Sequence, residues 1–170
     1  MRDLTDRALD TAARLGAAYA DVRVVRRLEE SIAIKTGRLE GVATGESEGF
    51  GVRVLVGGAW GFASSHRLEL DEADAIAAAA VRIARASAST LRRPAVLDDR
   101  PPATGRYETP LVEDPFAIPL EAKIADLLAA DRAAVAVKGI AFTESMYAAP
   151  SRAAVSRARS VRSRMRGGEA

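Results

Sequence analysis

The first part of the chain shows a helical pattern followed by an alternating one. Apolar residues recur at helical spacing over residues 3–15, where Asp3 is placed to cap the helix and Gly16 to end it. Apolar and polar residues then alternate, which is the period of a strand. The alternation predicts strands over residues 20–28 and 31–35, a turn at 36–38 and a weaker strand over 39–44. This order is typical of an antiparallel meander.

Residues 49–65 read GFGVRVLVGGAWGFASS and allow two interpretations, a phosphate-binding loop or a β-hairpin. A nucleotide fingerprint would need a strand before its glycines and a helix after them, whereas here the glycines precede a strand. Two β-type runs around Gly57-Gly58 favour the hairpin. The implied register sets Leu55 opposite Trp60, and we expect the Trp60 ring to pack on Leu55 and cover the backbone near Gly61.

The second part of the chain predicts two more helices, a connection and a strand. Small residues line one face of a helix over residues 71–87, with Asp71 as its cap. Five of the seven prolines fall within residues 88–118, which predicts an extended connection. We expect a helix from Pro119 to about residue 134, with its leucines inward, and a last strand over 135–147 with a bulge at Gly139. The predicted fold class is therefore α+β, a largely antiparallel sheet of about five strands with helices packed on it.

Composition changes this picture at the end of the chain. The 170 residues carry a net charge of +2, but residues 150–170 alone hold six arginines and one glutamate. The expected domain of residues 1–149, which includes the 88–118 connection, is thus mildly acidic, and 150–170 is expected to be an irregular Arg/Ser-rich tail. The chain has no cysteine, which excludes a disulfide framework and thiolate metal sites. No secretory signal or membrane span is apparent, and we expect a cytoplasmic protein.

Candidate catalytic chemistry is sparse. His66 is the only histidine, so the chain cannot build a histidine-rich zinc site, and a solvated loop residue is the simpler interpretation. Glu46 with Glu48 could hold a cation, although no calcium-loop pattern surrounds them. Arg23, Arg26 and Arg27 form either ordinary outward charge on a sheet or an anion or partner surface. We assign no catalytic, cofactor-binding or metal-binding residue in this chain.

The arginine-rich tail raises the separate question of nucleic-acid binding. Its six arginines could neutralise phosphates, but no aromatic residues are interleaved with them for base stacking. A solvated tail is the simpler interpretation, and nucleic acid is the less expected partner.

Several stretches resemble the N-terminal domain of the TldD/PmbA family, the so-called modulators of DNA gyrase. The resemblance rests on ADVR at residues 20–23, on the strand at 49–55 and on GAWGFAS at 58–64, and returns at VKGIAFTESMY, residues 137–147. The Trp-Gly-Phe-Ala-Ser form is more similar to the TldD subunit than to PmbA (TldE). The resemblance implies cytosolic zinc-dependent peptidases that act on peptides or unfolded proteins. It also implies pairing of TldD-type with PmbA-type subunits, or homodimers.

The family's zinc motif, His-Glu-x-x-x-His, lies in a later domain, and His66 is followed instead by Arg67-Leu68-Glu69. The resemblance therefore implies an N-terminal fragment of a TldD-like metallopeptidase that lacks the catalytic domain and is inactive alone, with zinc required only by the full-length family. The abrupt change of pattern near residue 150 suggests that the tail is read out of frame. The alternative is a stand-alone domain that binds a PmbA/TldE-type partner.

Overall fold

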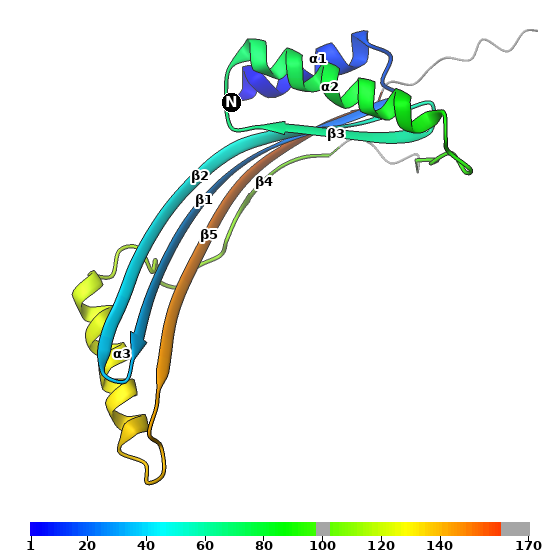
Figure 1. Cartoon of the computed structure of the whole chain (residues 1–170). Coiled ribbons are helices and arrows are strands. Elements are labelled where there is room, and N and C mark those ends of the chain that lie inside the picture. Colours follow the sequence, from blue (N-terminus) through cyan, green and yellow to red (C-terminus); the bar gives the residue numbers. More distant parts are fainter. Residues whose placement is uncertain (98–102, 161–170) are drawn as a thin grey trace, which may run out of the picture. The chain divides into compact units, whose positions relative to one another are not determined.

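The computed structural model describes residues 1–97 and 103–160 and has an α+β fold (Figure 1). The elements along the chain are α1 (Arg2–Arg14), β1 (Tyr19–Lys35), β2 (Arg38–Val56), β3 (Ala59–Ser65), α2 (Leu70–Ala88), β4 (Thr104–Glu108), α3 (Leu120–Val135) and β5 (Glu144–Ser160). The strands form one five-stranded sheet in the order β3-β2-β1-β5-β4. The predicted fold class is confirmed.

The chain divides into two compact units, and three strands contribute to both. Unit 1 contains Met1–Val25, Glu48–Tyr107 and the described residues from Ala154 onward. Unit 2 contains Arg26–Ser47 and Glu108–Ala153. Each of β1, β2 and β5 thus continues from one unit into the other without an intervening linker.

Unit 1 has an apolar core between its helices and its part of the sheet (Figure 1). The alternation seen in the sequence sets which strand residues are buried, because successive side chains point to opposite faces. The buried strand residues include Val22 and Val24 of β1 and Phe50, Val52 and Val54 of β2. The helices contribute Leu4, Ala8, Leu9 and Ala12 from α1 and Ala73, Ala77, Ala80, Val81 and Ala84 from α2. The bulky residue that α2 buries is Val81, whereas Ile83 is exposed.

The β2–β3 hairpin has the predicted antiparallel register, including Leu55 opposite Trp60 and Arg53 opposite Phe62. Gly57 and Gly58 form its turn with φ of 57° and 77°, which side chains disfavour. The expected role of Trp60 over Gly61 is wrong in one respect. A Cβ at Gly61 would meet the Ala80 carbonyl oxygen at 2.1 Å, so it is α2 that covers this backbone. The small-residue face of α2 is what permits so close an approach.

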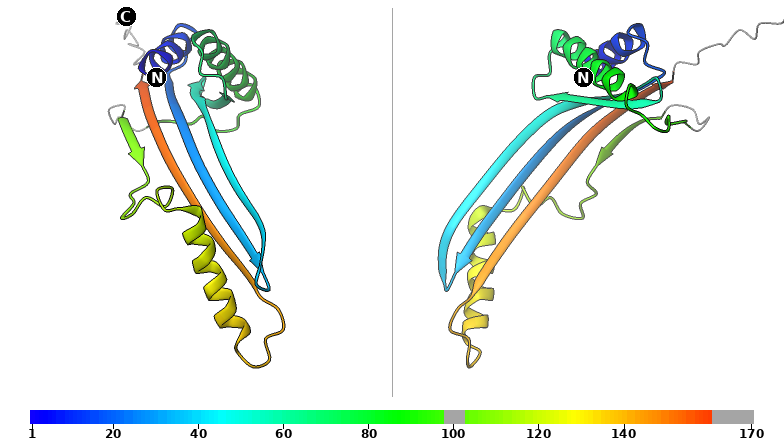
Figure 2. Two further views of the ribbon diagram at one scale, coloured as in Figure 1. Left: turned by 90° about the vertical axis from the view of Figure 1, so that its left-hand side faces the viewer. Right: turned by 45° about the vertical axis from the view of Figure 1, so that its right-hand side comes forward.

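Unit 2 consists of the remaining halves of β1, β2 and β5 together with α3 (Figure 2). A tight turn at Thr36-Gly37, with φ of 44° and 76°, joins β1 to β2 as predicted. The weak strand expected over residues 39–44 is part of the long β2. The inward leucines predicted for α3 are only half-buried, and its buried residues are instead Lys123 and Asp131.

Two sequence expectations for the C-terminal part are corrected. The strand predicted over residues 135–147 begins only at Glu144, because α3 continues to Val135 and a loop with Gly139 at φ 96° follows. Residues 150–160, expected to be an irregular tail, are the second half of β5. The backbone hydrogen bonds of a sheet need no apolar period, and Ala149 and Ala154 are buried in this strand. Residues 161–170, the rest of the expected tail, lie outside the described residues.

The proline-rich connection is mostly irregular, as predicted, but it contains the short strand β4, all five residues of which are exposed. Residues 98–102 of this connection lie outside the described residues. Among the helices that the structure describes, none has the length and apolar character needed to cross a bilayer.

Candidate functional site

The residues singled out in the sequence are dispersed over the surface. His66 is exposed in the loop between β3 and α2. Its neighbours bond to one another: the Arg67 amide donates a hydrogen bond to Ser65 Oγ, and the Arg67 guanidinium forms an ion pair with Glu72. Hydrogen bonds from Arg67 and Ser65 hold the pKa of Glu72 below its ordinary value.

The acidic and basic candidates pair with each other rather than forming a site. Glu46 pairs with Arg26 at 2.6 Å, and Arg27 pairs with Glu29 at 3.5 Å. Among residues 1–97 and 103–160, no group of three or more histidine, cysteine, aspartate or glutamate side chains is arranged to hold a metal ion. The residues present therefore do not fit a zinc site.

Two arginines of the former tail are also engaged in unit 1. Arg157 pairs with Asp6 and Arg159 pairs with Asp10, both acids lying on α1. Arg157 and Arg159 are alternate residues of β5 and therefore point to the same face of the strand. Their partners are four residues apart on α1 and share one face of that helix, so both ion pairs can form side by side. These two arginines are thus neutralised within the fold.

An aromatic cluster lies beside the hairpin of unit 1. The Arg53 guanidinium lies 4.9 Å from the centre of the Trp60 ring and bonds to Asp21 at 2.7 Å, and Tyr19 meets Trp60 edge to face. The hydrogen bond to Asp21 raises the pKa of Arg53. Burial, followed by the Asp21 charge, raises the pKa of Tyr19, which keeps its hydroxyl protonated. The cluster is polar and aromatic but contains no activated nucleophile or base.

Buried charge is the distinctive feature of unit 2. Lys123 of α3 is 5% exposed, bonds to Glu30 of β1 at 2.5 Å and lies 5.5 Å from the centre of the Tyr147 ring of β5. Asp131, fully buried further along α3, accepts a hydrogen bond from the Gly37 amide at 2.5 Å. Ser145 Oγ lies 3.4 Å from the same carboxylate. Two α3 side chains therefore hold the hairpin turn, β1 and β5 together.

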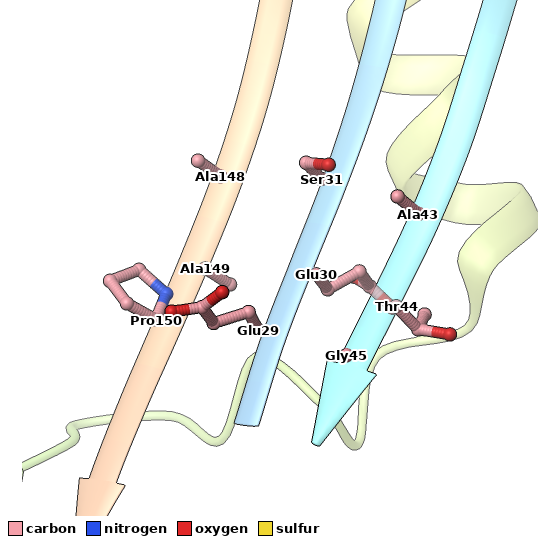
Figure 3. A pocket seen from close by; sticks show the side chains of 9 residues that line it. All are labelled: Glu29, Glu30, Ser31, Ala43, Thr44, Gly45, Ala148, Ala149 and Pro150. Atoms are coloured by element: carbon pink, nitrogen blue, oxygen red, sulfur yellow. The ribbon is translucent and has the colours of Figure 1, made fainter. Parts of the chain in front are cut away.

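A hollow of about 410 Å³ lies next to these charges in unit 2 (Figure 3). Most of its walls are small side chains and backbone, and its lining residues are Glu29, Glu30, Ser31, Ala43, Thr44, Gly45, Ala148, Ala149 and Pro150. Its two carboxylates already have partners, Arg27 and Lys123.

The sequence interpretation missed Lys123 and Asp131, although a signal was present. Both charges interrupt the apolar stripe formed by Leu120, Ile124, Leu127 and Leu128. A charge on the inward stripe of a helix is seldom buried without a partner, so it predicts an opposite charge or a backbone donor across the interface.

Comparisons with known proteins agree with this architecture. Residues 20–84 match the family described as PmbA/TldA metallopeptidase domain 1. The Metalloprotease MJ0996 of Methanocaldococcus jannaschii is 27% identical over 105 residues, which are 62% of this chain and 23% of that protein. The chain thus spans under a quarter of the length of this curated relative.

Two solved structures share the fold over nearly the whole chain. One is a Bacteroides thetaiotaomicron protein whose name links it to modulation of DNA gyrase, with a TM-score of 0.69, 21% identity and coverage of 92% of this chain and 36% of that one. The other is TldE from Thermococcus kodakarensis, with a TM-score of 0.60, 12% identity and coverage of 90% and 34%. The match over residues 20–84, the metalloprotease relative and the shared fold support a place for this chain in the TldD/PmbA family.

Proposed function

We propose that this chain is the N-terminal part of a TldD-like zinc metallopeptidase subunit. The observation that carries the proposal is the match of residues 20–84 to a metallopeptidase first domain, together with a fold that covers about a third of each solved relative. In this proposal the chain supplies scaffold and partner contacts in the cytoplasm. The hydrolysis of peptides or unfolded proteins belongs to the complete subunit.

The zinc chemistry is assigned outside these residues. A zinc peptidase site needs several nitrogen or oxygen ligands and a base, and this chain has a single histidine, which is exposed. We therefore expect the isolated chain to be inactive with or without added zinc. Zinc-dependent peptide hydrolysis by the purified chain would overturn the proposal.

A chimera tests the scaffold role directly. The corresponding N-terminal segment of Metalloprotease MJ0996 is replaced by residues 1–160 of this chain, and zinc-dependent hydrolysis of an unfolded protein is measured. We expect the chimera to retain measurable activity. Its matched control carries Gly61→Val, which forces α2 off β3 and should abolish activity. A folded but inactive chimera would contradict the proposal.

The alternative is a non-catalytic domain that binds a PmbA/TldE-type subunit, and exposed apolar side chains in unit 2 favour it. Phe142 is 54% exposed and Met146 is 74% exposed, with Val137 and Ile140 exposed nearby in sequence. Large exposed apolar side chains are a common feature of protein-binding surfaces. Co-purification with a TldE-type subunit that is lost on Phe142→Ser and Met146→Ser would favour this function.

Nucleic-acid binding through the arginine-rich segment is less supported. Arg157 and Arg159 already pair with acids of α1, so they are not free to neutralise phosphates.

A further inference from the structure

One end of unit 1 is formed by three segments of the chain, residues 15–18, 55–60 and 82–97. The Arg85 guanidinium of α2 donates a hydrogen bond to the Leu15 carbonyl at 2.6 Å. The loop after α2 folds back over the β2–β3 turn, where the Ala95 amide donates to the Gly58 carbonyl at 2.8 Å. Figure 1 shows the end of α2 beside this turn. The three segments therefore share one surface, which we call the basic end.

The basic end carries positive charge that no acid of these segments offsets. None of the three segments contains aspartate or glutamate, and residues 82–97 hold four exposed arginines, Arg82, Arg85, Arg92 and Arg93. Elsewhere in the chain, arginines such as Arg26 and Arg53 pair with acids. Within residues 1–97 and 103–160, Arg82, Arg92 and Arg93 form no ion pair. Their guanidinium groups are therefore available to an anionic ligand.

Aliphatic side chains are interleaved with these charges. Val96 is 91% exposed, and Ile83, Leu91 and Leu97 are exposed as well. Arginine is enriched in protein interfaces, and large exposed apolar side chains mark surfaces that contact other molecules. A ligand that fits the basic end thus offers both negative charge and apolar groups.

A polypeptide segment that carries carboxylates and aliphatic side chains meets both requirements. A guanidinium binds a carboxylate through two parallel N–H donors. Nucleic acid would leave the aliphatic side chains without partners, and residues 82–97 contain no aromatic ring on which a base could stack. A membrane surface also fits less well, because the apolar face of α2 is buried in the core of unit 1 and cannot enter a bilayer.

We propose that the basic end of unit 1 binds an acidic segment of a partner polypeptide that also carries aliphatic residues, with Arg92 and Arg93 as carboxylate-binding residues. The inference goes beyond the proposed peptidase role and does not rest on it. An inactive chimera would leave it standing, and a chain that binds no acidic peptide would leave the chimera experiment unaffected.

Fluorescence anisotropy with labelled peptides tests the proposal on the full chain. The probe is a short peptide made of glutamate and leucine, and its two controls replace every glutamate by glutamine or every leucine by serine. The chain should bind the probe, and each replacement should weaken binding about tenfold, because one removes the charge attraction and the other the apolar contact. Absence of binding, or equal binding of the probe and the glutamine control, overturns the proposal.

Charge reversal assigns the binding to particular arginines. The double variant Arg92→Glu with Arg93→Glu should weaken binding of the probe about tenfold or more, since two attractions become two repulsions. Its matched control is Arg2→Glu with Arg23→Glu, which makes the same change in net charge at exposed positions of unit 1 outside the basic end. The control should bind the probe as the wild type does. Equal loss in the two double variants, both shown folded by circular dichroism, overturns the proposal.

Two other anionic ligands are compared with the probe at the same salt concentration. One is a single-stranded oligonucleotide of equal charge, and the other is a vesicle of phosphatidylserine and phosphatidylcholine. We expect the probe to bind more tightly than either, because only the probe offers aliphatic side chains with its carboxylates. Tighter binding of the oligonucleotide or of the vesicle overturns the proposal in favour of a nucleic-acid or a membrane surface.

Discussion

The two units are stabilised by different means, although they share three strands. Among its described residues, unit 1 buries sixteen in one apolar cluster, many of them alanine and valine. Its helix α2 lies so close to β3 that the two backbones are in contact at Gly61. In unit 2 the fully buried apolar strand residues are Ile32 and Ile34, and α3 is attached through Lys123 and Asp131. One uninterrupted strand can therefore contribute to an apolar core in one unit and, in the other, lie against a helix that is held by buried charges.

The largest predicted effect tests how closely unit 1 is packed. Gly61→Ala should lower the free energy of unfolding by about 4 kcal/mol, because the new methyl would meet backbone atoms of Ala80 and Ala84 that cannot move without shifting α2. Gly41→Ala in unit 2 is the matched control, since no atom lies within 4 Å of its Cβ position. Urea denaturation measures both. Equal stability of the two variants would show that α2 is not closely packed on β3.

The next effect tests the buried ion pair of unit 2. Lys123→Met alone should cost about 3 kcal/mol, because it leaves the Glu30 carboxylate nearly buried without a counter-charge. The double variant Lys123→Met with Glu30→Leu should recover most of that loss, since two apolar groups of similar size need no pairing. Thermal unfolding of the wild type and of the single and double variants measures the coupling. An additive double variant would mean that the two side chains do not interact.

A smaller effect is expected at the hairpin turn of unit 2. Asp131→Ala removes the acceptor of the Gly37 amide and should cost about 2 kcal/mol, whereas Asp131→Asn keeps an oxygen in place and should cost less. Hydrogen exchange at Gly37 provides a local measurement. The prediction fails if the Gly37 amide exchanges equally slowly in the wild type and in Asp131→Ala.

The smallest effect concerns the surface of unit 1, where Asp74 accepts hydrogen bonds from Arg7 and Thr11. The bond from Arg7, followed by that from Thr11, lowers the pKa of Asp74 below 3.8. A carboxyl group whose pKa is lower in the folded than in the unfolded state stabilises the fold at pH values above the unfolded-state pKa. That stabilisation is lost as the pH falls through the folded-state pKa. Asp74→Asn should therefore cost about 1 kcal/mol at pH 7, and this cost should shrink as the pH falls below 3.8. A difference between wild type and Asp74→Asn that is constant from pH 7 to pH 2 would contradict this.

The sequence predicted the elements of unit 1 well because their periods are simple. Alternation gave the buried faces of β1 and β2, and Gly57-Gly58 gave the hairpin register. The close packing at Gly61 was not predictable, because it depends on a helix that follows later in the chain and on where that helix crosses β3.

Unit 2 and the end of β5 were harder to predict from local pattern. The inward face of α3 was not recognised, because two of its buried residues are charged. The strand at residues 150–160 was not recognised either, because its arginines pair with Asp6 and Asp10, some 150 residues earlier in the chain. Since residues 150–160 form a strand, the loss of pattern that motivated an out-of-frame tail is absent there. That residues 161–170 are read out of frame stays a prediction, because they lie outside the described residues. The absence of catalytic, cofactor and metal residues in this chain likewise stays a prediction.

The continuity of β2 constrains chain length more strictly than amino-acid identity. Its exposed residues 38–48 lead without a loop into Phe50, Val52 and Val54, which are buried in unit 1. Deleting one residue from the exposed part would have to be absorbed before Phe50, or it would exchange the inward and outward faces of the strand. Homologues should therefore vary freely in sequence along this segment while keeping its number of residues, a pattern of variation opposite to that of ordinary surface loops.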